Sequence, residues 1–571
     1  MKLRGWIFGT VLCLVLIKPL ILILVLGVPI FFADEWSLVP FIEKVWHGQA
    51  NFQDYWTALA EHRIFIPRLI FALIYRPGIV DPRQIMLISW LIMSWAYALA
   101  IWYFFLKRTK LAGSAKFLYA FCFLSLGLSL VQYENWLWAL QLHFFLTQVF
   151  VILAAILIGI DSIGNGTKSL LIALCAAGAS MCTGQGMLLW LSGGLCAFLI
   201  ARTWVSRGLL AFSFLCGMAL FVWFYHADGS GQLGQSSRLF WILHSPLQGL
   251  HSYFGLVGNP LTFCFGFARL KQAPIVGVVL VMLFACQVIV VLKRKLLQRS
   301  IPFILLGSFG LFYCGLVTLG RSGNGPINEW FLTSRYATNS LSIPLALVGL
   351  SFVIAVFSQR QDRSIEIDLL LCNVPLFLVF ALCFASEVQA IGWASGDSSM
   401  RRFTAGLLPF FTLFDGATDG VSTGPFYPLC PVDNSKLISW AILPAMKVGF
   451  IPGPRDITVT PLADFGVQVE TDVKRKTVLY LSHHTDPRVV EGWVQIPERI
   501  TPHAILLRKP GEEKFLTAAK LEKEKGSEKG LFKYRWQFLI LPVLDPDPGA
   551  RFEAALLDEK EAMLFPLGNT L

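Results

Sequence analysis

Charged side chains are scarce in this sequence. Asp, Glu, Lys and Arg make up only 15% of its 571 residues, while 55% are hydrophobic, and the mean hydropathy is +0.63. Soluble domains carry about 25% charged residues. The composition therefore excludes an ordinary soluble protein and predicts a polytopic membrane protein. A net charge of +11 is what basic cytoplasmic loops produce, so no nucleic-acid partner is expected.

Motifs of metal, disulfide and nucleotide chemistry are also missing. The 12 cysteines include no CxxC pair, and only Cys430 lies outside or away from the apolar segments. Small packing residues explain them better than a disulfide framework. The chain contains no P-loop, no dinucleotide fingerprint and no internal repeat. The sequence therefore predicts no metal site from its residues.

Long apolar runs fill the first two thirds of the chain. After M-K-L-R comes an apolar run that is far too long for a signal peptide, so we expect an uncleaved first transmembrane helix. In all, the sequence predicts about eleven membrane-length runs: 8–32, 84–106, 117–132, 137–160, 168–182, 185–201, 208–225, 275–292, 301–319, 341–357 and 366–386.

The charges of the connections predict the orientation. With a cytoplasmic N-terminus, the inner segments hold 15 Lys or Arg against 2 Asp or Glu, and they include K-R-T-K at 107–110 and K-R-K-L-L-Q-R at 293–299. Positive residues accumulate on the cytoplasmic side of membrane proteins. We therefore expect a multi-pass protein of the inner (plasma) membrane whose C-terminal region is extracytoplasmic.

The chain divides into three expected parts. Residues 1–390 form the transmembrane domain, in which 36–46 reads as an interfacial amphipathic helix. Residues 391–450 form a linker with a second interfacial helix. Residues 451–571 contain short alternating runs separated by Pro, Gly and charged turns, such as V-E-G-W-V-Q-I at 490–496. That pattern predicts a small extracytoplasmic β-sandwich-like domain.

Two adjacent carboxylates, Asp34 and Glu35, follow the first apolar run. One interpretation is a hydrated helix end beside the interfacial Trp36. The other is catalysis, because a general base requires a carboxylate within reach of an acceptor hydroxyl. Side chains of adjacent helical residues point about 100° apart. The two acids are therefore expected to have different roles.

Further polar residues gather on the predicted outer side and are candidates for substrate binding. Arg and His suit a phosphate, although an Arg near a membrane surface also snorkels to headgroups. Trp136 and Trp138 read either as an aromatic belt or as surfaces for a sugar ring. The candidate residues are Glu61, His62, Arg63, Glu134, Asn135, Gln141, His143, Arg321, Arg335 and Tyr336.

The arrangement resembles the GT-C glycosyltransferase superfamily, and in particular a group of bacterial multi-pass membrane proteins. The resemblance rests on a first helix that ends in D-E, a long first outer loop, many short transmembrane helices and an outer C-terminal domain. It also rests on four motifs: D-E-W-S-L-V-P-F-I-E-K at 34–44, E-H-R-I-F-I-P-R-L-I at 61–70, Y-E-N-W-L-W-A-L-Q-L-H-F-F at 133–145, and G-R-S-G-N-G with S-R-Y at 320–336.

The resemblance implies a transferase that uses a polyprenyl-phosphate-linked sugar as donor and a lipid or glycan as acceptor. It places a catalytic carboxylate at Asp34 or Glu35, with Asp34 favoured as the base. It allows a divalent metal, Mg²⁺ or Mn²⁺, as a possible cofactor. Two alternatives stay open: a transporter or flippase of lipid-linked sugars, and a polymerase or ligase of surface polysaccharide. A transporter should show pseudo-symmetric halves, which the sequence lacks.

Overall fold

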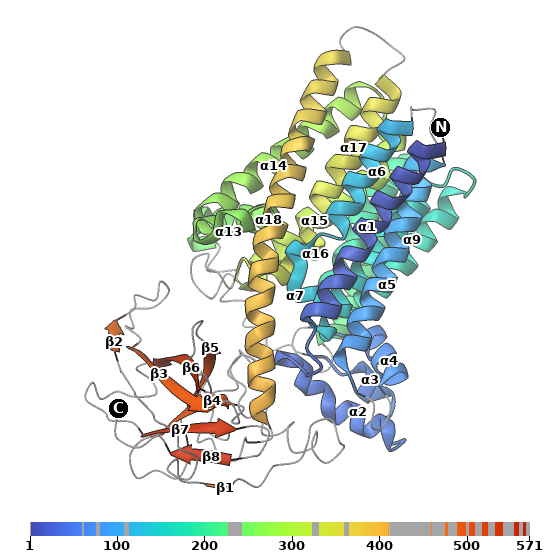
Figure 1. Ribbon diagram of the computed structural model, residues 1–571. Coiled ribbons are helices and arrows are strands. Elements are labelled where there is room, and N and C mark those ends of the chain that lie inside the picture. The colour runs from blue at the N-terminus through green and yellow to red at the C-terminus, as the bar shows by residue number, and fades with distance from the viewer. Residues whose placement is uncertain are drawn as a thin grey trace. The chain divides into compact units, whose positions relative to one another are not determined.

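The computed structural model describes most of the helical part and the strands of the C-terminal part (Figure 1). The described residues are 2–59, 62–75, 80–107, 113–201, 203–226, 243–321, 331–358, 365–408 and 410, and then 458–459, 474–477, 488–497, 502–508, 515, 517–523, 531–540, 553–558 and 563–566.

The described residues contain 9 helical segments that are long and apolar enough to span a membrane. They confirm a multi-pass helical membrane protein and coincide with nine of the eleven predicted runs. The segments are Phe8–Leu26, Pro82–Leu106, Ala115–Trp136, Ala139–Gly159, Val205–Trp223, Arg269–Lys293, Leu297–Arg321, Ser334–Phe357 and Asn373–Leu407.

Regular helices within these segments have the following bounds: α1 Lys2–Leu26, α5 Pro82–Ile101, α6 Gly113–Gly127, α8 Leu142–Gly159, α11 Trp204–His226, α14 Arg269–Lys293, α15 Leu297–Arg321, α17 Ser342–Ser358 and α18 Ile365–Leu407. The other two predicted runs form shorter helices, α9 Asn165–Ser180 and α10 Leu188–Ile200. At 1.5 Å per residue, helices of 16 and 13 residues fall short of the ~30 Å hydrocarbon layer. The predicted count of eleven is therefore not confirmed.

Short helical turns connect the long helices and carry most candidate site residues. They are η1 Ala33–Leu38, α2 Val39–Trp46, α3 Phe52–Trp56, α4 Phe65–Ile74, η3 Leu130–Gln132, α7 Tyr133–Trp136, η4 Ala139–Gln141, η5 Gly184–Met187, α13 Pro246–Gly258, η6 Asn259–Leu261, η7 Phe263–Ala268, η9 Ser334–Tyr336 and α16 Ala337–Ser340. The structure confirms helical conformation at 36–46, which belongs to η1 and α2. Ten residues of α4 are too few to cross a membrane.

Close helix packing in this part depends on small residues. A Cβ on Gly277 of α14 would lie 1.8 Å from the carbonyl oxygen of Phe254 in α13, and one on Gly258 would lie 2.0 Å from that of Ala273. Only glycine permits this approach of two backbones, as in many membrane helix pairs. The contact fixes the start of η6, whose Asn259 donates a hydrogen bond from Nδ2 to the carbonyl oxygen of Thr333 at 3.0 Å.

The chain divides into two compact units. The membrane unit comprises Met1–Pro29, Ala50–Ile74 and Asp81–Ser395, and the sheet unit comprises Ile30–Gln49, Tyr75–Val80 and Gly396–Leu571. The turn that carries Asp34 and Glu35 thus belongs to the sheet unit. Helix α18 continues through the predicted linker as far as Leu407. The second interfacial helix predicted within 391–450 lies beyond Leu407, outside the described residues.

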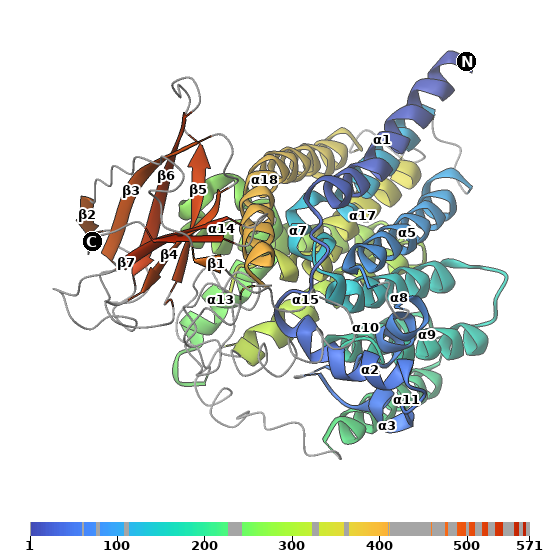
Figure 2. The ribbon, with the colours of Figure 1, turned by 60° about the horizontal axis from the view of Figure 1, so that its bottom comes forward.

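The C-terminal part contains a β-sheet, as predicted (Figure 2). Its strands are β1 Thr458–Val459, β2 Lys474–Thr477, β3 Arg488–Pro497, β4 Pro502–Arg508, β5 Thr517–Lys523, β6 Leu531–Ile540, β7 Glu553–Asp558 and β8 Met563–Pro566. They hydrogen-bond in the order β1-β8-β7-β4-β5-β6-β3-β2. Every pairing is antiparallel except β1 with β8. Strand β5 pairs with β4 on one side and with β6 on the other, so the eight strands form one continuous hydrogen-bonded series. The predicted sandwich-like arrangement of these strands stays a prediction.

The sheet packs on the C-terminal end of α18 within the sheet unit. The His503 ring of β4 stacks on Phe403 with centroids 5.3 Å apart. The Nε2 atom of His503 lies 3.1 Å from the Phe403 carbonyl oxygen, and Lys520 of β5 donates to Ser399 Oγ. These contacts fix the last turns of α18, which also carry Arg401.

Candidate functional site

The acid pair lies in the 3₁₀ turn η1, beyond the end of the first helix. Helix α1 ends at Leu26, and η1 begins with Ala33, whose φ of +49° lies in the left-handed region. A residue with a Cβ is strained there, and such strain is typical of functional sites. The turn separates the two acids: Asp34 is half-buried and Glu35 is fully buried. The two adjacent carboxylates therefore have different environments, and their different roles stay a prediction.

Glu35 closes the turn, and its surroundings favour the neutral, protonated form of its carboxyl group. Its Oε2 accepts a hydrogen bond from the Phe32 backbone N–H at 3.1 Å. Burial raises the pKa of the Glu35 carboxyl to about 8, although the Phe32 N–H and the charge of Arg401 lower it. Among the described residues Oε1 has no hydrogen-bond partner. A carboxyl with this pKa is mostly protonated at neutral pH, so its Oε1–H is a potential donor.

Arg401 of α18 supports the same turn. Its guanidinium carbon lies 3.5 Å from the centroid of the Phe32 ring, and its side chain is 5% exposed. A cation over an aromatic face is attracted by the ring quadrupole, more strongly when water is excluded. Arg401 therefore orients the residue that donates to Glu35. No local pattern in the sequence points to Arg401, because its partner Phe32 lies more than 360 positions away along the chain.

A basic cluster forms in the membrane unit around Tyr336, as the sequence predicts. Arg321 is the last residue of α15, and its guanidinium carbon lies 6.0 Å from the Tyr336 ring centroid. Arg335 lies 5.5 Å from the same centroid. The Tyr336 hydroxyl is buried and has no hydrogen-bond partner among the described residues. Two cations at the ring of one tyrosine, together with its unused hydroxyl donor, suit an anionic ligand.

Residues of helix α7 hold the backbone of this cluster through hydrogen bonds. Glu134 Oε2 accepts a hydrogen bond from the Arg335 N–H at 2.8 Å, and the Glu134 N–H donates to Ser334 Oγ at 2.9 Å. Asn135 Nδ2 donates to the Arg335 carbonyl oxygen at 2.9 Å. The predicted binding residues Glu134 and Asn135 therefore contact Arg335 directly, and their contacts with it hold its backbone on both sides.

His62 and His143 form a separate pair in the membrane unit, with ring centroids 5.3 Å apart. Nδ1 of the buried His143 lies 2.6 Å from the Leu140 carbonyl oxygen, and Nδ1 of His62 accepts from the Gly184 N–H at 3.4 Å. Gln141, two residues before His143, is also buried, and its Oε1 has no hydrogen-bond partner among the described residues. The binding roles of these three residues stay predictions.

Arg63, Trp136 and Trp138 are all buried in the membrane unit, and the binding role of Arg63 stays a prediction. Arg63 is 2% exposed and donates to the Trp56 carbonyl oxygen at 2.9 Å, while Glu61 lies outside the described residues. Trp136 and Trp138 are both buried, and Trp136 stacks on Phe145 with centroids 4.2 Å apart. They form neither an exposed sugar platform nor an interfacial belt. The sequence suggested both because it does not show which side of the segment 136–138 is covered.

A charged pair that the sequence analysis missed lies within the candidate membrane spans. Lys18 of α1 and Glu387 of α18 form an ion pair at 2.6 Å. A lone lysine inside the first apolar run was the available signal, because intramembrane charges are costly and seldom lack a partner.

No group of three or more His, Cys, Asp or Glu side chains suited to a metal ion occurs within the described ranges. The divalent metal that the resemblance allows stays a prediction, and no step below depends on it. Comparisons of the chain with protein-family models, curated proteins and solved structures give no match. The likeness to the GT-C superfamily therefore rests on the arrangement and the motifs read from the sequence.

Proposed function

We propose that this protein is an integral membrane glycosyltransferase. It transfers a sugar from a polyprenyl-phosphate donor to an acceptor hydroxyl on the extracytoplasmic face. The observation that carries the proposal is the cluster of Arg321 and Arg335 at the ring of Tyr336, whose buried hydroxyl has no hydrogen-bond partner among the described residues. Such a set of donors binds a phosphate and stabilises the negative charge that grows on it when a glycosidic bond breaks.

Asp34 supplies the base in this proposal. It is half-buried in η1, whereas Glu35 is buried and mostly neutral at pH 7. A carboxylate that is not fully buried can be reached by an acceptor hydroxyl and take its proton. Glu35, in its protonated form, holds the turn through the Phe32 N–H. This division of roles favours Asp34 over Glu35 as the general base.

The reaction is a displacement at the anomeric carbon. The acceptor hydroxyl attacks this carbon and gives its proton to a carboxylate base, and the bond from the anomeric carbon to the phosphate oxygen breaks. The polyprenyl phosphate leaves with that electron pair, and Arg321, Arg335 and the Tyr336 hydroxyl stabilise its charge. Atoms and charges balance without a further reactant.

The direct test is sugar transfer in proteoliposomes that contain the purified full chain and lipid extracts from the native membrane. Wild-type protein should move sugar from polyprenyl-phosphate carriers to a lipid or glycan, detected by mass spectrometry. Comparing lipids and surface glycans of cells with and without the gene identifies the sugar. Movement of intact sugar-lipid across the bilayer without any transfer would contradict the proposal and favour a flippase. Growth of long polymers would favour a polymerase or ligase.

A further inference from the structure

The ion pair of Lys18 and Glu387 is a costly feature with no role in the reaction above. Nζ and Oε1 are 2.6 Å apart, and the side chains are only 22% and 10% exposed. Both residues lie within candidate membrane spans. They line a cavity of about 240 Å³ whose other walls are mostly apolar, including Leu14, Phe121 and Phe384. Removal of one partner in such surroundings leaves an uncompensated charge, which is strongly destabilising.

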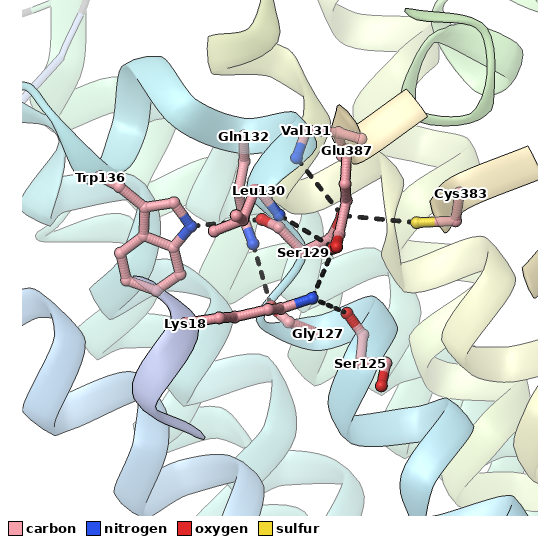
Figure 3. Close-up of polar contacts among 10 residues, drawn as sticks. All are labelled: Lys18, Ser125, Gly127, Ser129, Leu130, Val131, Gln132, Trp136, Cys383 and Glu387. Carbon is pink, nitrogen blue, oxygen red and sulfur yellow. Dashed lines mark hydrogen bonds and ion pairs between the residues drawn. The ribbon is translucent and has the colours of Figure 1, made fainter. Parts of the chain in front are cut away.

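Glu387 is more than a partner for Lys18. The same Oε1 accepts a hydrogen bond from the Leu130 backbone N–H at 3.0 Å, at the start of η3. Lys18 Nζ in turn donates to the Ser125 carbonyl oxygen at 3.4 Å, and Ser129 Oγ lies 3.4 Å from Cys383 Sγ. Figure 3 shows these contacts converging on the segment between α6 and α7. The pair therefore fixes the backbone that enters η3.

Hydrogen bonds continue from η3 to the basic cluster. Gln132 Nε2 donates to the Gly127 carbonyl oxygen at 3.0 Å (Figure 3), and its Oε1 accepts from Thr338 Oγ1 at 2.5 Å. Thr338 Oγ1 accepts from Asn135 Nδ2 at 2.6 Å, and the same Nδ2 donates to the carbonyl oxygen of Arg335. The polar path thus ends on the backbone of a cluster arginine, and all of its residues belong to the membrane unit.

We propose that Lys18 and Glu387 are positioning residues for the Arg321, Arg335 and Tyr336 cluster. Glu387 anchors η3 through the Leu130 N–H, and the ion pair with Lys18 orients the Glu387 side chain. The Gln132 and Asn135 side chains transmit that position to Arg335. The ligand assigned to the cluster rests on the proposed function, whereas the mechanical link between Glu387 and Arg335 does not.

The test uses the purified full chain in detergent micelles, with farnesyl phosphate as a short polyprenyl phosphate probe. Hydrogen–deuterium exchange follows the peptides 129–136 and 334–340, and a binding titration gives the Kd. The informative variants are Glu387→Leu, Glu387→Gln, Lys18→Met and the charge swap Lys18→Glu with Glu387→Lys. Lys168→Met is the matched control, because Lys168 is a buried lysine that donates to the Ile158 carbonyl oxygen at 3.2 Å, away from η3.

Loss of the Glu387 oxygen that accepts from the Leu130 N–H should weaken probe binding about tenfold, the equivalent of one lost hydrogen bond. Glu387→Leu and the charge swap should both show this loss, with faster exchange in both peptides. Glu387→Gln should lose less, because its amide oxygen still accepts from Leu130. Lys168→Met should leave the Kd and both peptides unchanged.

The charge swap decides between positioning and simple helix docking. It restores opposite charges but places a lysine, which cannot accept a hydrogen bond, opposite the Leu130 N–H. Wild-type binding and exchange in the swap would overturn the proposal, since the pair would then only join α1 to α18. Unchanged exchange of 334–340 in Glu387→Leu would also overturn it; should that variant not fold, the charge swap gives the same comparison, because it too removes the acceptor for the Leu130 N–H. If wild-type protein does not bind the probe, the proposed function fails while the exchange data still decide the link.

Discussion

The carboxylate turn at 33–38 and the basic cluster at 321–336 hold their reactive groups by opposite means. In the turn, Ala33 is strained at φ +49° and Glu35 is buried with one carboxyl oxygen unpartnered among the described residues. In the cluster, the backbone of Arg335 is fixed on both sides by Glu134 and Asn135. The turn contains a strained backbone residue, whereas the backbone of the cluster is held by hydrogen bonds.

This difference separates reactivity from binding. A group that exchanges a proton benefits from an environment that shifts its pKa, even at a cost in stability. A group that holds a phosphate benefits from a fixed position, because charge and geometry then do not reorganise during the reaction. The two regions should therefore respond differently to substitution: the turn in rate and pH dependence, the cluster in ligand affinity.

Asp34→Asn should give the largest effect. The amide cannot accept the proton of the acceptor hydroxyl, so the rate of sugar transfer should fall by about 10²–10⁴-fold, the usual worth of a general base. The measurement is single-turnover transfer in proteoliposomes. Asp54→Asn is the matched control in the same predicted loop, where Asp54 caps α3 by accepting from the Asn51 N–H at 2.9 Å. Transfer at the wild-type rate in Asp34→Asn would refute the base assignment.

Glu35→Gln should remove a pH dependence of stability. The carboxyl pKa is raised from 4.5 to about 8 by folding, so the native state binds more protons than the unfolded state between these values. Stability then falls as pH rises through this window, by up to about 5 kcal/mol. The Gln amide oxygen still accepts from Phe32 but does not titrate. Melting temperatures from pH 5 to pH 8 should therefore decline for the wild type and vary much less for the variant; parallel curves would contradict the assignment.

Arg335→Ala should weaken donor binding more than it slows transfer at saturation. One charge-assisted hydrogen bond contributes about 1.5–3 kcal/mol, so KM for the donor should rise about 10–100-fold. Arg83→Ala is the control, because Arg83 is an exposed arginine whose Nη2 pairs with Asp81 Oδ2 at 2.6 Å. The comparison between the regions fails if Arg335→Ala lowers kcat alone and leaves KM unchanged.

Tyr336→Phe should have the smallest effect on the reaction. Unlike most substitutions of a buried residue, it should increase the stability of the protein. The hydroxyl is buried without a partner among the described residues, and such a group costs about 1–3 kcal/mol. Its removal should stabilise the protein by about 1 kcal/mol while weakening donor binding. Thermal unfolding and donor titration measure the two quantities. A variant that is less stable and binds normally would show that the hydroxyl serves packing.

Local patterns in the sequence predicted much of this protein. Apolar runs located the nine long helices of the described residues, and alternating residues at 490–496 and 504–508 located β3 and β4. These successes have one cause: partition into a membrane and strand pairing depend mainly on residues close together in the chain.

Tertiary structure alone decided the environments of individual side chains. It buried Glu35 and left Asp34 half-exposed, although the two are adjacent, and it covered Trp136 and Trp138. It joined Lys18 to Glu387 across 369 positions. The sequence by itself determined that the chain is a multi-pass helical protein with a small C-terminal sheet. Which polar groups meet, and which lose water, follows from how the helices pack, because burial and ion pairing depend on neighbours that a linear pattern does not specify.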